Sequence, residues 1–220
     1  MGGIPTVTVL ISGRGSNLIN LFNRADGYQI GAVISNSRDA AGITWAREHS
    51  IPVTIIERAK FPSLGTFKDA LREAVCATTP DFVALAGFMV VLPPSFIEAF
   101  PDRLINIHPS LLPKFPGLDT HARAITAGET KHGCTVHCVD SEVDTGAIIA
   151  RATLELSPGE TPASLAERTL KLEHELYPWV VRHLARGKIS IRGARIHYSS
   201  EVHQEAGERG FQLPADNECV

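Results

Sequence analysis

The stretch "TVTVLISGRGSNL", residues 6–18, decides how this chain folds. Its first part, "TVTVLIS", is apolar and rich in β-branched residues, which is typical of a buried strand. A glycine loop follows, and a helix is expected from about Leu18. A strand that passes through a glycine turn into a helix is the opening of an alternating α/β fold.

The alternation continues downstream. Strands are expected at 31–36, 52–57 and 81–87 and in "RLINIH", with helices between them. This order predicts an α/β fold with a Rossmann-like, mostly parallel sheet covered by helices, and ligand sites at the carboxyl ends of its strands. In the carboxyl-terminal half, "CTVHCVD" and "AIIARATLEL" flank the loop "SEVDTG", which predicts a smaller antiparallel extension. Thr161 and Pro162 should then open a long helix that Pro178 kinks or divides.

Bulk properties narrow the class of protein. The chain has 220 residues and a formal net charge of −3, so it lacks the basic footprint of a nucleic-acid-binding protein. No apolar run reaches the roughly 20 residues that a membrane helix needs. Four cysteines without a leader sequence suggest reduced thiols, and hence a cytoplasmic protein. We predict one domain over 1–198, followed by a polar, mobile tail over 199–220. The oligomeric state is left open.

A polar pair ends one of the expected strands. In "NIHPSLLPKFPG", residues 106–117, Asn106 and His108 are two residues apart and therefore share a face of the strand. A carboxamide and an imidazole at the rim of a sheet can both donate to one oxygen and so stabilise an oxyanion. The alternative is that both side chains only cap neighbouring backbone groups.

A carboxylate could join this pair. Asp144 lies in the tight loop "VDSEVDTGA", and a carboxylate beside His108 would favour the protonated imidazolium. The alternative is that Asp144-Thr-Gly is only hairpin turn chemistry.

The glycine loop "LISGRGSNL" suggests a phosphate site. Gly13 and Gly15 permit tight turns, and the amides of Ser16 and Asn17 can face an anion at the start of the helix. Leu18 stands where a dinucleotide fingerprint needs its third glycine, so that type of site is not expected. A lone Gly-x-Gly is equally consistent with a simple turn.

No metal is expected. His132, Cys134, His137 and Cys138 in "HGCTVHC" match none of the usual zinc spacings, and on a strand His137 points away from the other three.

Taken together, these residues resemble the phosphoribosylglycinamide formyltransferase family. The similar pieces are spread in order over about 6–187, and they are "LISGRGSNL", "VISN", "LAGFMVVL", "NIHPSLLPKFPG", "HGCTVHCV", "VDTGAII" and "EHELYP". "NIHPSLLP" alone is shared by other tetrahydrofolate-dependent formyl-transferring enzymes, whereas "SGRGSN", "PGLDTHARA" and "HGCTVH" narrow the resemblance to this family.

The resemblance implies roles. It implies a single formyltransferase domain with a phosphate-binding half over about 6–110 and a folate and catalytic half over about 111–198. It implies that 10-formyltetrahydrofolate donates a formyl group to a small-molecule amine, glycinamide ribonucleotide. Asn106, His108 and Asp144 would be catalytic. The ribonucleotide would be bound by Gly15, Ser16, Asn17 and Glu173, and the folate by Met89, Val90, Val91, Leu92, Asp140, Ser141, Glu142, Val143 and Asp144.

Two points of this assignment have alternatives. On composition alone, plain core is the preferred reading of Met89–Leu92. Family members often carry an arginine for the glutamate tail of the folate in the segment matching 61–68, where this chain has Leu64 as the nearest counterpart.

Other readings remain. A formyltetrahydrofolate deformylase uses a similar Asn, His and Asp set but carries an additional amino-terminal domain, which is not expected here because the sheet starts at Thr6. A methionyl-tRNA formyltransferase would need a further carboxyl-terminal domain and a basic surface. A non-catalytic folate- or nucleotide-binding module would make the polar trio a coincidence.

Overall fold

The computed structural model describes residues 3–214 of the chain. The chain divides into two compact units, Met1–Ile105 and Asn106–Val220. No helix in the described part of the chain is long and apolar enough to cross a membrane.

The first unit is built on a parallel sheet. Its strands are β1 (Thr6–Ile11), β2 (Gln29–Ser35), β3 (Val53–Ile55) and β4 (Phe82–Leu85), arranged in the order β4-β1-β2-β3. Val7, Val9, Leu10 and Ile11 of β1 are completely buried. A parallel strand covered on both faces needs a continuous apolar run of this kind, which is why "TVTVLI" predicted it.

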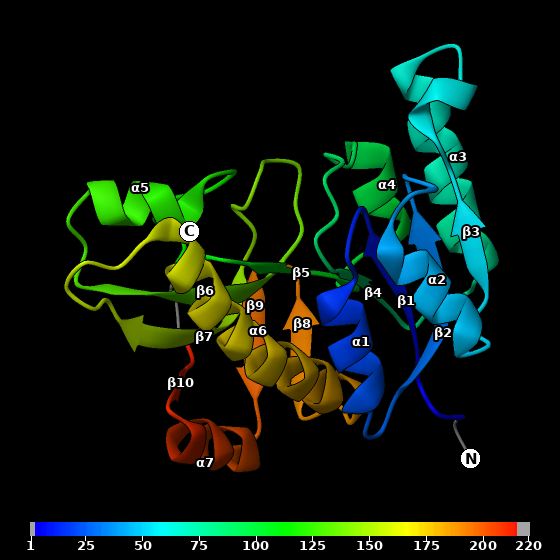
Figure 1. Ribbon diagram of the computed structural model, residues 1–220. Helices are drawn as coiled ribbons and strands as arrows, with labels where there is room; N and C mark the ends of the chain where they lie inside the picture. The colour runs from blue at the N-terminus through cyan, green and yellow to red at the C-terminus, as the bar shows by residue number, and fades with distance from the viewer. Residues whose placement is uncertain (1–2, 215–220) are drawn as a thin grey trace. The chain divides into compact units, whose positions relative to one another are not determined.

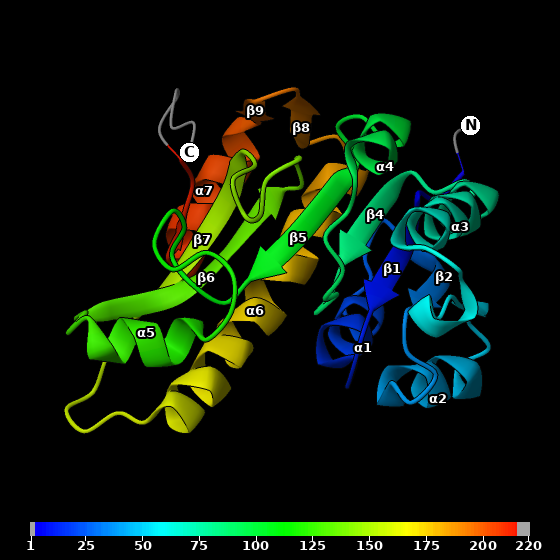
Figure 2. The same cartoon turned by 90° about the horizontal axis from the view of Figure 1, so that it is seen from above.

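Helices lie on both sides of these strands. They are α1 (Ser16–Asn23), α2 (Ala41–Glu48), α3 (Leu64–Ala77) and α4 (Pro94–Ala99), with a short 3₁₀ turn η1 at Arg58–Lys60. Figure 2 shows α1 and α2 on one side of β1 and β2, and α3 and α4 on the other. The Ser63 hydroxyl starts α3 by accepting a hydrogen bond from the Thr66 amide, as a helix N-cap does.

The second unit contains the antiparallel extension. Strand β5 (Leu104–His108) crosses the boundary between the units, and β6 (Lys131–Cys138) pairs antiparallel with β7 (Ile148–Glu155). A separate antiparallel pair is formed by β8 (Ile189–Arg192) and β9 (Arg195–Tyr198). The prediction of a mostly parallel α/β sheet with a smaller antiparallel part is confirmed.

One long helix covers the second unit. Helix α6 (Pro162–Ala185) packs against β6 and β7, and Figure 1 shows it as the longest helix of this unit. Thr161 is its N-cap, as predicted, and Pro162 occupies the first turn, where a missing amide hydrogen is tolerated. The helix runs through Pro178 without being divided, and the residues around Pro178 are fully buried, so tertiary packing compensates for the lost hydrogen bond.

The polar tail is more ordered than its composition predicts. Helix α7 (Ser200–Arg209) is followed by β10 (Phe211–Gln212), which pairs antiparallel with β7. The α7 residues Val202 and Ala206 are buried, and Glu205 contacts the buried His183 of α6 at 2.9 Å. Residues 200–212 thus form a helix and a strand where the composition predicted a mobile tail, because two buried apolar side chains and the ion pairs of Glu201, Glu205 and Arg209 dock this short polar helix. Residues 215–220, including Cys219, lie outside the described part.

Helix α5 (Thr120–Thr126) is joined to β6 through two imidazoles. His121 Nδ1 lies 3.0 Å from His132 Nε2, and His132 is 1% exposed. Burial, followed by the neighbouring His121, lowers the pKa of His132 to about 4, although a hydrogen bond to the Pro109 backbone and the charge of Glu129 act in the opposite direction. His132 is therefore neutral at neutral pH.

The neutrality of His132 makes the stability depend on pH. An unfolded histidine has a pKa of about 6.5, so between about pH 6.5 and 4 the unfolded chain binds a proton that folded His132 does not. The contribution of His132 to the free energy of unfolding should be complete above about pH 6.5 and should decline toward pH 4 by about 3 kcal/mol. Urea unfolding at a series of pH values should show a flatter dependence for His132→Gln than for the parent. His197→Gln, an exposed control on β9, should keep the parental slope, and an unchanged slope in His132→Gln would contradict this account.

Candidate functional site

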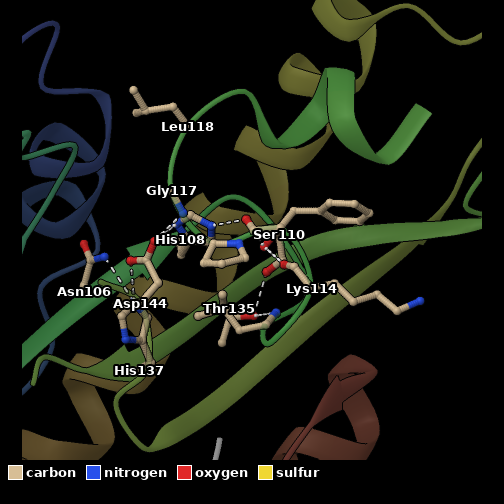
Figure 3. Close-up of polar contacts among 12 residues, drawn as sticks. Asn106, His108, Ser110, Lys114, Gly117, Leu118, Thr135, His137 and Asp144 are labelled. Carbon is tan, nitrogen blue, oxygen red and sulfur yellow. Dashed lines mark hydrogen bonds and ion pairs between the residues drawn. The ribbon is translucent and has the colours of Figure 1, made fainter. Parts of the chain in front are cut away.

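The structure brings Asn106, His108 and Asp144 together within the second unit. Asn106 and His108 lie on one face at the carboxyl end of β5, and His108 is 5% exposed. Asp144 comes from the loop between β6 and β7, and its Oδ2 atom lies 3.3 Å from His108 Nδ1. Figure 3 shows the three side chains at one spot beside the sheet.

The orientation of the His108 ring is fixed by a backbone carbonyl. Its Nε2 atom lies 2.9 Å from the Phe115 carbonyl oxygen. Because a carbonyl can only accept, Nε2 carries a hydrogen whatever the charge of the ring. The remaining nitrogen, Nδ1, faces Asp144.

A hydrogen bond and a left-handed backbone conformation together fix the position of the Asp144 carboxylate. Its Oδ2 atom accepts a hydrogen bond of 2.8 Å from the Gly117 amide, and its side chain is 11% exposed. Its backbone has φ of 60°, in the left-handed region that aspartate tolerates better than most residues. The local turn chemistry expected for Asp144-Thr-Gly is therefore present, and the same turn aims the carboxylate at the imidazole.

His137 joins this cluster and was missed by sequence reasoning. Its Nε2 atom lies 3.1 Å from Asn106 Nδ2, and its Nδ1 atom lies 2.7 Å from the Cys138 carbonyl oxygen. The pairing of β6 with β7 shifts register between Val136 and His137, so strict alternation does not predict the contacts of this side chain. Burial lowers the pKa of His137, against the opposing effects of the Cys138 carbonyl and Asp144. No sequence motif marks this contact.

A buried hydroxyl pair shapes the loop that carries the Phe115 carbonyl. Ser110 Oγ donates to the Lys114 carbonyl at 2.6 Å and also lies 3.3 Å from the Phe115 carbonyl. Thr135 Oγ1 donates to the Ser110 carbonyl at 2.7 Å and accepts from the Leu112 amide at 3.1 Å. Both hydroxyl-bearing residues are fully buried. They hold Phe115 in a left-handed backbone conformation with φ of 56°.

The other predicted residues of the second unit occupy α6 and the loop after β6. Glu173 lies on α6 and is 8% exposed. Asp140 accepts hydrogen bonds from the Thr145 hydroxyl and the Glu142 amide, which folds the loop back on itself. Ser141, Glu142 and Val143 are exposed.

The predicted phosphate loop has the expected backbone geometry within the first unit. Gly15 precedes the first turn of α1 with φ of 76°, and a Cβ atom there would lie 2.8 Å from the Gly42 Cα atom. Only glycine fits this position without a backbone shift. The backbone amides at the start of a helix point outward along its axis and carry partial positive charge, so the start of α1 suits an anion.

The predicted folate segment is not ordinary core. Met89 and Val91 are 67% and 56% exposed, whereas Leu92 is buried. The Met89 amide donates to the Ser12 hydroxyl at 2.9 Å, so the segment is tied to the end of β1. Val90 is half-buried, and Leu64, in place of an arginine, is exposed at the start of α3. Exposed apolar side chains on a fixed loop suit a flat, apolar ligand.

Within residues 3–214, no group of three or more histidine, cysteine, aspartate or glutamate side chains is arranged to hold a metal ion. His132 pairs with His121, and His137 pairs with Asn106, so the imidazoles of "HGCTVHC" are used separately.

The hydroxyl pair yields a test of the loop. Thr135→Val should lower the free energy of unfolding by about 1–3 kcal/mol, because it leaves the buried Leu112 amide without its acceptor. Thr54→Val on the exposed face of β3 is the matched control and should stay within about 0.5 kcal/mol of the parent. Denaturant titration measures both values, and equal effects in the two variants would contradict the scaffold role.

Comparisons with known proteins identify the family. The family model described as formyl transferase matches residues 6–181. A relative named phosphoribosylglycinamide formyltransferase, from Haemophilus influenzae, is 37% identical over 91% of this chain and 97% of its own length. A trifunctional purine biosynthetic protein, adenosine-3, from Drosophila pseudoobscura pseudoobscura, is 43% identical over 91% of this chain, which spans 15% of that longer protein. The crystal structure of glycinamide ribonucleotide transformylase 1 from Symbiobacterium toebii matches with a TM-score of 0.86 and 38% identity, covering 90% of this chain and 95% of its own. This chain belongs to the formyl transferase family.

Proposed function

We propose that this protein transfers the formyl group of 10-formyltetrahydrofolate to the amine of 5′-phosphoribosylglycinamide, a step of de novo purine biosynthesis. The observation that carries the proposal is the convergence of Asn106, His108 and Asp144 in a chain of this family. Relatives whose names state this activity match about nine tenths of this chain, and this supports the same two substrates here.

The chemistry requires stabilisation of a developing negative charge. The primary amine attacks the formyl carbon, a new C–N bond forms, and the formyl oxygen gains charge in the tetrahedral intermediate. Asn106 Nδ2–H is the donor for that oxygen, and the His108 imidazolium supports the developing charge through its own positive charge, because its Nε2–H is committed to the Phe115 carbonyl and its Nδ1–H faces Asp144. Fixed donors need little reorganisation as the charge develops.

A proton must then move between two nitrogens. The attacking amine loses a proton, the bond from the formyl carbon to N10 of the folate breaks, and N10 gains a proton. Asp144 lies beside His108 Nδ1 and supports its positive charge. Its carboxylate relays the proton directly or through water, and the Gly117 amide keeps it in place during the transfer.

Substrate binding is assigned to residues of both units. Gly15, Ser16 and Asn17 offer backbone amides to the phosphate, and Glu173 binds the glycinamide part. The residues assigned to the folate are Met89–Leu92 in the first unit and Asp140–Asp144 in the second, and the exposed apolar ones among them are Met89, Val91 and Val143. The reaction requires no metal ion.

A spectroscopic transfer assay tests the proposal. Purified protein is mixed with 10-formyltetrahydrofolate, with and without glycinamide ribonucleotide. Tetrahydrofolate should form only when the amine is present, with formylated glycinamide ribonucleotide in equal amount. Formate released without the amine would instead indicate a deformylase, and folate binding without turnover would indicate a binding module.

Asn106→Ala measures the role of the carboxamide. Removing one oxyanion donor should lower kcat by about 100- to 1000-fold, with KM changed much less, because the donor acts on charge that exists only in the transition state. Gln29→Ala, which removes an exposed carboxamide at the start of β2, is the control and should retain parental kcat. An Asn106→Ala variant within a few-fold of the parent would show that the carboxamide is not a donor.

A further inference from the structure

We propose that neutral His137 is the positioning residue that sets which end of the Asn106 carboxamide faces the substrate. The inference rests on the proposed function, since it assigns a cause to the orientation of the donor used there. His137 Nε2 and Asn106 Nδ2 are 3.1 Å apart, and His137 is 2% exposed, so water does not compete for this contact.

The tautomer of His137 follows from its other nitrogen. Nδ1 lies 2.7 Å from the Cys138 carbonyl oxygen, which can only accept, so Nδ1 carries the hydrogen. In the neutral ring Nε2 is then a bare acceptor. A bare acceptor accepts a hydrogen bond from the Nδ2 amide of Asn106 and repels its Oδ1 oxygen. The imidazole therefore selects one of the two rotations of the carboxamide.

The competing arrangement is a charged His137 paired with Asp144. In that case Nε2 would donate, and Asn106 would turn its oxygen toward the ring. The separation of 3.6 Å between His137 Nε2 and Asp144 Oδ1 is too long for a hydrogen bond. Asp144 is also committed to the Gly117 amide and to His108 through its other oxygen. Burial also favours the neutral ring of His137, because a charged imidazolium would lose its hydration there.

The orientation matters for the chemistry. With one Nδ2 hydrogen directed to His137, the other remains for the formyl oxygen, and the Oδ1 atom is left to accept from the attacking amine. The flipped carboxamide would present oxygen where charge develops and would repel it. The side chain of His137 is thus excluded from direct chemistry but controls the donor.

Two substitutions separate this role from simple packing. His137→Phe keeps a ring of similar size but has no acceptor, and kcat should fall by about 10- to 100-fold, the scale of a misplaced catalytic group. KM for both substrates should stay within about threefold. His137→Gln can present its Oε1 atom near the position of Nε2, and it should recover kcat to within about fivefold of the parent.

A double-mutant cycle provides the decisive control. If His137 acts only through Asn106, His137→Phe should change kcat by less than about twofold in the Asn106→Ala background. Equal losses in both backgrounds would overturn the proposal and leave His137 a packing residue.

Nitrogen NMR tests the contact without any turnover. The ¹⁵N spectrum of the parent protein should show His137 with hydrogen on Nδ1 only, and a coupling across the hydrogen bond from Asn106 Nδ2 to His137 Nε2. Hydrogen on Nε2 would overturn the proposal even if every variant folded poorly. If instead the parent shows the predicted tautomer but transfers no formyl group, the proposed function fails while the contact stands.

Discussion

The hydrogen bond from His108 Nε2 to the Phe115 carbonyl is the constraint on which the site depends. It removes one ring nitrogen from the chemistry and turns the other toward Asp144. The loop that carries the Phe115 carbonyl is fixed by further hydrogen bonds. The buried hydroxyl groups of Ser110 and Thr135 donate hydrogen bonds to the backbone carbonyls of Lys114 and Ser110. Since a buried hydrogen-bonding group without a partner is costly, this scaffold has few alternative arrangements.

Two histidines in one cluster have opposite electrostatic tasks. His108 faces a carbonyl oxygen on one side and a carboxylate on the other, a setting that a doubly protonated ring can satisfy. His137 faces a carbonyl oxygen and an amide hydrogen, which only a neutral ring can satisfy. The difference comes from the partners and not from the distance to Asp144, which both rings approach. One carboxylate therefore lies beside two imidazoles whose hydrogen-bond partners differ.

The two units differ in the local chemistry at the ends of their strands. The parallel strands of the first unit end in a glycine loop whose backbone amides suit a phosphate, and in a segment with exposed apolar side chains. The second unit supplies the polar side chains that suit a developing oxyanion. In the first unit these groups lie on the loop between β1 and α1 and on the segment after β4. In the second unit they lie on β5 and the loop that follows it.

The sequence by itself determined the order of strands and helices, the parallel and antiparallel parts of the fold, and the pairing of Asn106 with His108 on one face. These features depend on local periods of apolar residues, on glycine and proline, and on the two-residue repeat of a strand. Only the tertiary structure decided that Asp144 and His137 reach this pair, that helix α6 passes through Pro178, and that residues 200–212 dock. A register shift re-aims His137, and buried packing compensates for Pro178 and for the polar tail. Contacts between residues about 30 positions apart depend on how strands pair and bulge, and no local pattern in the chain records that.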